Sequence, residues 1–339
     1  LLLETGRIDD RQPENARYNP GIGALSLDFN QTLLSWRPDS DAATVEAFET
    51  PTFDEAGPGL ATADPGAGRD LTYAGPSVGG RWLLSPAAPR AGSAYLPVKL
   101  PGLRTARVFR RFANMIGVEL PEPEAAAAAA GTRVVARIGS LPLVDIVRLG
   151  LEHSNNMVAE LVGQVAARRL AGKPGTLAQS SGVLVDWLKA NLPKTAWGGF
   201  VLPNHSGLSS AARASPAQMV AVVRFAGDQR YAGWNYPALL PASGMREAMR
   251  GRFRDPTTAL RIWAKTGTLK YAKGLVGVLF TQQGRQLAFA LFVTDFDGRR
   301  AYDAAANVEA PEVKAKAEEW IRRAEAFEED IVREWIILY

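Results

Sequence analysis

The sequence contains no cysteine and only two histidines, His153 and His205, among its 339 residues. The lack of cysteine excludes disulfides, cysteine-ligated zinc sites, iron–sulfur clusters and a thiol nucleophile. Two histidines are too few for a histidine-rich metal cage, so we expect no metal site. Any catalytic mechanism must therefore move protons mainly on lysine, serine, aspartate and glutamate side chains.

Long apolar runs and segregated charge are also missing. The 39 basic and 35 acidic residues give a net charge of +4 and a pI near 9.3, but the two signs are interspersed. No basic tract favours nucleic acid as a partner. No run reaches the ~18 consecutive apolar residues of a membrane helix, and the first residues lack the basic region and apolar core of a secretory signal. We therefore expect neither a nucleic-acid partner nor a transmembrane segment.

Nucleotide-binding and common hydrolase motifs are absent too. No GxxxxGK[ST] sequence occurs, and the glycine-rich pieces near Gly21 and Gly66 do not open a helix after a strand. No HExxH is found, and the GxSxG match at Gly75–Gly79 lies in a Gly- and Pro-rich stretch without the strand-to-helix pattern that a nucleophile elbow needs. His205 stands beside Ser206, but adjacent residues rarely face each other, so we interpret His205 as a loop residue. We expect no cofactor.

The composition that remains, 47% hydrophobic and 22% charged, is that of a globular protein, and the length fits about two domains of ~100–200 residues. Alternation at Leu25, Leu27 and Phe29 predicts a strand or hairpin within 22–36. The stretch 38–80 is rich in Asp, Glu, Gly, Pro and Ala and is interpreted as loop-rich. A short apolar piece at 82–84 follows, and this first region closes near Pro101.

The rest of the chain passes from helical patterns to strand patterns. Apolar spacing predicts helices over 108–116, 143–151, 157–170 and 177–191, a short strand over 133–138, and strands over 261–268, 275–281 and 286–293. The sequence Ser215-Pro216-Ala217-Gln218 is typical of a capping box that opens another helix. The alanine run 125–130 is interpreted as a connector. A long helix beyond Pro311 should lie across the last three strands, and this order predicts an α+β fold.

Two short motifs carry the chemistry: Ser154-Asn155-Asn156 and Lys265-Thr266-Gly267-Thr268. Ser154 and Asn156 can project to one side of a turn, and Lys265 should point away from the face of its two strand neighbours. Gly267 leaves room for a substrate backbone at the strand edge. Each motif alone is better explained by a structural role than by a catalytic one, and the first would be a helix N-cap. Together, about 110 residues apart, they match a pair found in serine β-lactamases and penicillin-binding proteins; chance motifs on an unrelated α+β scaffold are the remaining alternative.

The sequence resembles the D-alanyl-D-alanine carboxypeptidase/endopeptidases, low-molecular-mass class C penicillin-binding proteins with an inserted domain. The segments that carry this resemblance are HSNNMVAELV from His153, NHSGLSSAARASPAQMV from Asn204, LPASG from Leu240 and WAKTGTLKYAKGLVGVL from Trp263. The resemblance implies a DD-peptidase-like catalytic domain over 102–339, with an antiparallel sheet flanked by helices, after the C-terminal part of a β-rich inserted domain over 1–101. Asn204 and His205 stand where the family usually has an acidic residue and glycine.

The resemblance also implies substrates and roles. The substrates would be peptidoglycan stem peptides and β-lactams, and the location the periplasm. Ser154 would relay a proton toward the leaving amine, and Asn156 would hold the substrate amide. Lys265 would supply positive charge, assisted by Thr266, and the backbone N–H of Thr268 would form half of an oxyanion hole.

The family's nucleophile is the serine of an SxxK motif, and no serine in this sequence is followed by lysine three residues later. Two interpretations stay open: a chain that begins within the inserted domain and lacks the nucleophile helix, or a non-catalytic, peptidoglycan-binding pseudoenzyme. Either way we predict that this chain alone is inactive. Without that helix and its neighbouring strands, a sheet edge should be uncovered and promote self-association.

Overall fold

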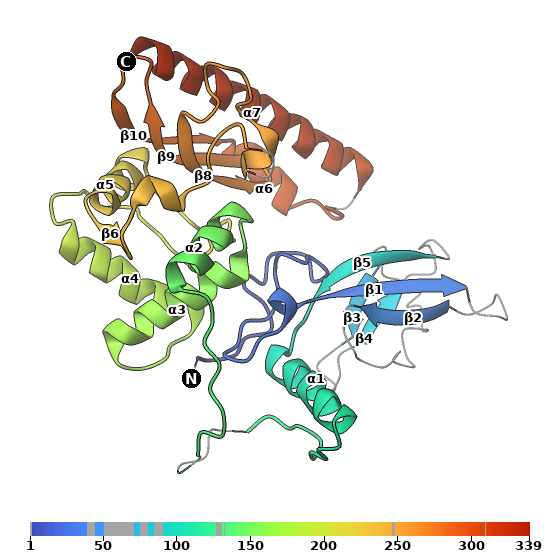
Figure 1. Ribbon diagram of the computed structural model, residues 1–339. Helices are drawn as coiled ribbons and strands as arrows, with labels where there is room; N and C mark the ends of the chain where they lie inside the picture. The colour runs from blue at the N-terminus through green and yellow to red at the C-terminus, as the bar shows by residue number, and fades with distance from the viewer. Residues whose placement is uncertain are drawn as a thin grey trace. The chain divides into compact units, whose positions relative to one another are not determined.

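The computed structural model describes residues 2–38, 45–50, 71–74, 81–84, 91–126, 131, 133–245, 248–308 and 310–339. The chain forms two compact units: unit 1 comprises Leu1–Ser140 and Asn156–Ser180, and unit 2 comprises Leu141–Asn155 and Ser181–Tyr339. Helices and antiparallel strands occur together, which confirms the α+β class (Figure 1). The division into an inserted and a catalytic domain at 101/102 stays a prediction.

Unit 1 contains two small antiparallel sheets. Strands β1 (Gln31–Pro38), β2 (Val45–Thr50) and β5 (Gly92–Pro97) form one in the order β2-β1-β5, and β3 (Leu71–Ala74) pairs with β4 (Arg81–Leu84). The stretch interpreted as loop-rich thus includes β2 and β3, and its other residues lie outside those described. The short apolar piece at 82–84 lies in β4. Helices α1 (Pro101–Met115) and α3 (Asn156–Ala171) complete the unit.

The first predicted strand starts later than its pattern suggested. Asp28, Phe29 and Asn30 form the short 3-10 helix η1 (Asp28–Asn30) with positive φ angles of 52°, 54° and 52°. The Asn30 amide group donates hydrogen bonds to the carbonyl of Gly21 and the hydroxyl of Ser26. This side-chain bonding fixes a turn in place of an extended strand. Strand β1 therefore begins at Gln31 and pairs with β2 beyond the predicted range, so a strand forms there but the hairpin within 22–36 is wrong.

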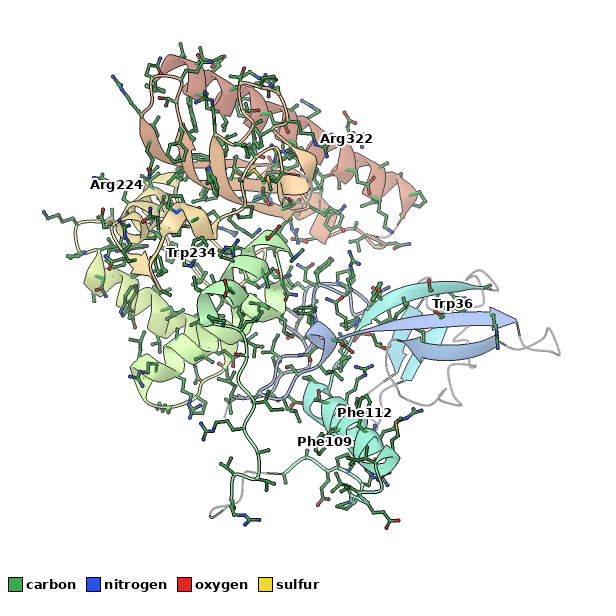
Figure 2. All side chains as sticks on the ribbon, in the orientation of Figure 1. Trp36, Phe109, Phe112, Arg224, Trp234 and Arg322 are labelled. Carbon is green, nitrogen blue, oxygen red and sulfur yellow. The ribbon has the colours of Figure 1, made fainter. Side chains whose placement is uncertain are left out.

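Two further features of unit 1 show where apolar patterns mislead. Helix α1 is confirmed, but only Val108 and Ala113 of its apolar face are buried, whereas the Phe109 and Phe112 side chains are exposed (Figure 2). The predicted strand at 133–138 is wrong, because its residues have no strand partner among those described. A β-branched run has strand propensity but still needs a neighbouring strand. Of the alanine run, residues 125–126 have no regular structure and 127–130 lie outside the described residues.

Unit 2 holds the predicted three-stranded sheet. Strands β8 (Ile262–Leu269), β9 (Ala272–Phe280) and β10 (Gln286–Thr294) are antiparallel in the order β10-β9-β8. Helices α5 (Pro216–Gly227) and α7 (Pro311–Leu338) pack against β9 and β10 on opposite sides of the sheet (Figure 1). The other elements are α2 (Leu143–Glu152), most of α4 (Leu177–Asn191), β6 (Arg230–Tyr231), β7 (Trp234–Asn235), η2 (Tyr236–Leu239), η3 (Ala248–Gly251) and α6 (Phe296–Asp303). Helix α5 begins with the predicted Ser215–Gln218 capping box.

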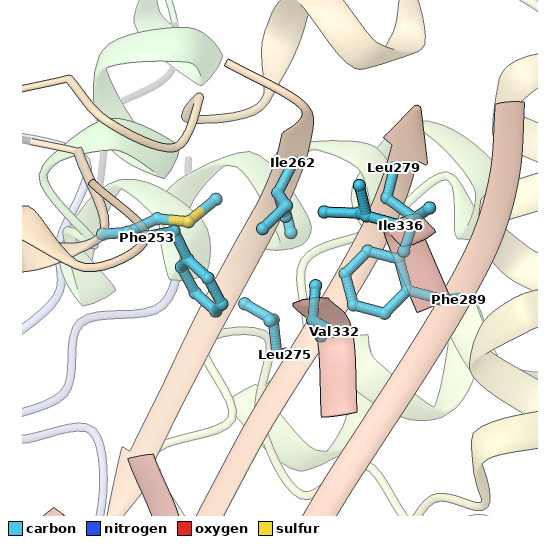
Figure 3. Close-up of a cluster of buried hydrophobic side chains, with 9 residues drawn as sticks. Phe253, Ile262, Leu275, Leu279, Phe289, Val332 and Ile336 are labelled. Atoms are coloured by element: carbon cyan, nitrogen blue, oxygen red, sulfur yellow. The ribbon is translucent and has the colours of Figure 1, made fainter. Parts of the chain in front are cut away.

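The core of unit 2 lies between the sheet and α7. Figure 3 draws its buried members and labels Phe253, Ile262, Leu275, Leu279, Phe289, Val332 and Ile336. Val332 and Ile336 are one turn apart on α7, so both side chains meet the same face of the sheet. Full burial of such a side chain is worth about 1.5–3 kcal/mol. This contact confirms that the C-terminal helix lies across the strands, and it fixes which face of β8 points away from α7.

Candidate active site

Ser154 ends helix α2 in a strained conformation. The N–H of Asn155 donates to the carbonyl of Gly150 at 2.9 Å, and the N–H of Ser154 donates to that of Leu151 at 3.3 Å. These two bonds define a Schellman motif, in which the residue at the Ser154 position adopts left-handed backbone angles and is usually glycine. Ser154 has a φ of 51°. It is thus a C-terminal capping position of α2, and the N-cap position predicted for this segment falls at Asn155, immediately before α3. A non-glycine residue at the Ser154 position is typical of functional sites.

This capping turn brings Ser154 to the lysine of the second motif. The Lys265 Nζ donates to the Ser154 Oγ at 2.8 Å and to the carbonyl of Thr266 at 2.6 Å. The two residues are 111 positions apart in the sequence. A cation and a hydroxyl group are therefore held together at the junction of a helix end and a strand, as the pairing of the motifs predicts.

The alternation of β8 sets the direction of each motif residue. Ile262 and Ala264 point their side chains into the core beside α7, so Lys265 and Gly267 point to the opposite face. The backbone N–H of Ala264 donates to the carbonyl of Pro241 on the outer edge of the sheet. Because backbone groups alternate between the two edges of a strand, the N–H and C=O groups of Thr266 and Thr268 also point outward.

That outer edge is open along the motif. Among the described residues, β8 pairs with β9 alone, apart from the bridge between Ala242 and Trp263 at its start. A β-carbon added at Gly267 would have its nearest neighbour 4.0 Å away, whereas one added at Gly277 would lie 2.2 Å from the carbonyl oxygen of Trp263. Packing therefore requires glycine at 277 but not at 267. The space at Gly267 is available to a molecule that approaches this edge.

Asn156 is the first residue of α3, and the chain passes from unit 2 to unit 1 immediately before it. Its side-chain amide donates to the carbonyl of Tyr18 at 2.9 Å, a contact within unit 1. The structure thus brings together Ser154 and the Lys265–Thr268 strand. The role of Asn156 stays a prediction.

His205 lies in a loop, as predicted. Burial lowers the pKa of His205 to about 4, so its imidazole is neutral at neutral pH. The neighbouring Ser206 Oγ accepts a hydrogen bond from the N–H of Leu208 in a local turn, consistent with a loop.

Sequence reasoning missed Lys273, whose Nζ donates to the Thr268 Oγ1 at 2.7 Å. Its signal was a lone charge in the otherwise apolar strand β9.

The part of the chain that the structure describes holds no cluster of three or more His, Asp or Glu side chains able to bind a metal ion. In the same residues, no helix has the length and hydropathy needed to cross a membrane.

The fold is similar to that of a penicillin-binding protein of known structure. Penicillin-binding protein 4 from Haemophilus influenzae has a similar structure, with a TM-score of 0.65 and 17% sequence identity. The match covers 94% of this chain and 70% of the Haemophilus chain. The model of the D-Ala-D-Ala carboxypeptidase 3 (S13) family matches residues 96–313. This chain belongs to that family of serine-type carboxypeptidases, which confirms the resemblance found in the sequence.

Curated relatives include a carboxypeptidase of Mycobacterium tuberculosis, 31% identical over 210 residues, which are 58% of this chain and 44% of the relative. Carboxypeptidase DacB of Mycolicibacterium smegmatis is 31% identical over 190 residues, 52% of this chain and 40% of the relative. The similarity therefore covers less than half the length of either relative.

Proposed function

We propose that this chain carries the substrate-binding strand of a serine-type D-Ala-D-Ala peptidase that acts on peptidoglycan stem peptides in the periplasm. The observation that carries the proposal is the Lys265 ammonium, 2.8 Å from the Ser154 hydroxyl on a strand whose outer edge is open. Family membership supports the class of substrate.

A stem peptide can bind by adding a strand to the open edge of β8. The outward N–H groups of Thr266 and Thr268 and the C=O group of Thr268 offer main-chain hydrogen bonds, and the gap at Gly267 admits the peptide. Lys265 would attract the terminal carboxylate through a charge-assisted bond. The Thr268 N–H would stabilise a developing oxyanion, an interaction worth about 2.7–4 kcal/mol in other hydrolases. Ser154 would pass a proton to the leaving amine, and Asn156 would hold the substrate amide.

The covalent step needs a serine and a base that the printed sequence does not supply as SxxK. In that step a serine oxygen attacks the carbonyl of the penultimate D-Ala, the lysine takes its proton, and the terminal D-Ala leaves as an amine before water hydrolyses the ester. We propose that this chain alone binds stem peptides without acylation. The same missing motif favours a second candidate, a non-catalytic protein that binds peptidoglycan.

Replacing Lys265 tests the binding site shared by both candidates. Lys265→Ala should weaken the binding of a peptide ending in D-Ala-D-Ala at least tenfold, because a hydrogen bond between charged groups is worth about 1.5–3 kcal/mol. Isothermal titration calorimetry measures the change. Lys270→Ala, in the turn after β8, is the matched control and should bind like the unaltered chain. Equal affinity of Lys265→Ala and the unaltered chain would refute this site.

We also propose that the outer edge of β10 pairs with a second copy of this chain. Residues 287–293 are uninterruptedly apolar, and β10 is the last strand of its sheet. Such an edge, without charge or proline, favours association. Sedimentation velocity should show dimers or larger species that grow with concentration. Ala290→Pro removes one outward N–H without touching the bonds to β9, and should return the chain to a monomer. A chain that is monomeric at all concentrations would contradict this proposal.

A further inference from the structure

A lysine is buried in the apolar layer between the sheet and α7. Lys273 lies on β9 and is 4% exposed, and its side chain shares a face with those of Leu275 and Leu279, which are fully buried. An ammonium group in such a place costs several kcal/mol unless it is paired and hydrogen-bonded. The contacts that compensate this cost show what the lysine connects.

Lys273 links the strand of the candidate site to α7. Its Nζ donates to the Thr268 Oγ1 at 2.7 Å and to the Glu325 Oε1 at 2.8 Å. Thr268 is its direct partner in the β8–β9 register, and Glu325 lies on α7. One ammonium therefore joins the edge strand, the central strand and the helix.

Two other hydrogen bonds hold the turn between β8 and β9, which follows Thr268. The Arg299 Nη1 donates to the carbonyl of Lys270 at 3.3 Å, and the N–H of Asp295 donates to the carbonyl of Tyr271 at 3.0 Å. These bonds fix the turn, but neither reaches β8 itself. Among the described contacts, only the bond from Lys273 fixes the Thr268 side chain.

We propose that Lys273 is a positioning residue that fixes Thr268, and with it the outward backbone N–H that receives the substrate. The inference rests on the proposed function. The Thr268 hydroxyl lies on the α7 face and its N–H points to the open edge, so Lys273 acts through Thr268 without touching the ligand. A purely structural ion pair would affect stability and leave ligand binding unchanged.

Substitutions at both ends of the Lys273–Thr268 bond separate these roles. Lys273→Met removes the donor but keeps the length of an apolar chain, and Thr268→Val removes the acceptor at constant shape. Thr268→Ser keeps the acceptor. The matched control is Lys270→Met, which makes the same lysine-to-methionine substitution three residues away in the same hairpin. Three properties are measured: binding of the peptide ending in D-Ala-D-Ala, the unfolding midpoint, and amide hydrogen exchange of Gly267 and Leu269, whose N–H groups face β9.

We expect Lys273→Met and Thr268→Val each to weaken binding about tenfold, and the double variant to be no weaker than either single one. Thr268→Ser should recover most of the binding lost in Thr268→Val, and Lys270→Met should bind within about twofold of the unaltered chain. The unfolding midpoint of Lys273→Met should fall, because Glu325 loses its partner, so binding is compared at a temperature at which every variant is folded. Gly267 and Leu269 should exchange several-fold faster in Lys273→Met, while strand β10 keeps its rate. Unchanged binding together with unchanged exchange would overturn the proposal, as would additive losses in the double variant.

Hydrogen exchange needs no ligand, so it distinguishes this inference from the function on which it rests. If the unaltered chain binds no peptide, the proposed function fails, and exchange at Gly267 and Leu269 alone decides the role of Lys273. Faster exchange in Lys273→Met then supports positioning, and an unchanged rate refutes it.

Discussion

Incubation of this chain with a fluorescent penicillin is expected to leave no covalent band on a denaturing gel. Acylation requires a serine whose proton is taken by a base. The printed sequence supplies no SxxK pair, and among the described residues of the candidate site the serine bonded to a lysine is Ser154, 2.8 Å from the Lys265 Nζ. Without a serine–lysine pair of the SxxK kind, we expect no acyl-enzyme to form.

The measurement requires a positive control and a way to trace an unexpected signal. An intact penicillin-binding protein labelled in the same reaction shows that the reagent is active. A band on this chain that survives denaturation would contradict the prediction, and peptide mapping would identify the modified residue. Loss of that band in Ser154→Ala would show that the Ser154–Lys265 pair itself performs the chemistry.

Arg252→Met should destabilise the fold by about 3–5 kcal/mol, because it leaves a buried carboxylate without its partner. Arg252 donates to the Glu328 carboxylate on α7 at 2.8 Å, and the Glu328 side chain is fully buried. It also donates to the Glu329 carboxylate at 2.8 Å and to the carbonyl of Glu325 at 3.1 Å. Burial already raises the pKa of Glu328, although Arg252 opposes this shift.

Urea unfolding with linear extrapolation measures this loss. Arg333→Met is the control, since Arg333 forms an exposed ion pair with Asp330 on the same helix, and it should cost no more than about 1 kcal/mol. The raised pKa of Glu328 determines how the stability changes with pH. A carboxyl group whose pKa is raised in the folded state stabilises that state at low pH, and this contribution is lost as the pH rises through the folded pKa. The deficit of Arg252→Met should therefore shrink on acidification from pH 7. A deficit that equals that of Arg333→Met would contradict the prediction.

Local rules predicted most of unit 2 from the sequence. The helix over 177–191 has the bounds of α4, the capping box at Ser215 forms as expected, and the three strands appear in the predicted order. In these segments the apolar period, the turn residues and the burial all favour the same structure. The opposite faces of Lys265 and Ala264 followed from alternation alone.

The features that could not be predicted depend on contacts between distant residues. The start of β1 is set by the Asn30 side chain, which bonds to Gly21 and outweighs the alternation before it. Strand propensity at 133–138 is not realised, because no partner strand meets it among the described residues. Lys273 looked like an isolated charge in an apolar strand, and only the fold brings Glu325 to it. In each case the sequence shows a propensity, and the long-range partner decides whether it is used.

The left-handed backbone of Ser154 has a practical consequence for engineering. Glycine adopts this conformation with less strain than any other residue, so a screen for thermal stability alone should select Ser154→Gly early. That same substitution removes the hydroxyl which accepts from Lys265. At this position the most stabilising change and the most damaging one coincide, and thermostable libraries of this chain should be sorted by ligand binding from the first round.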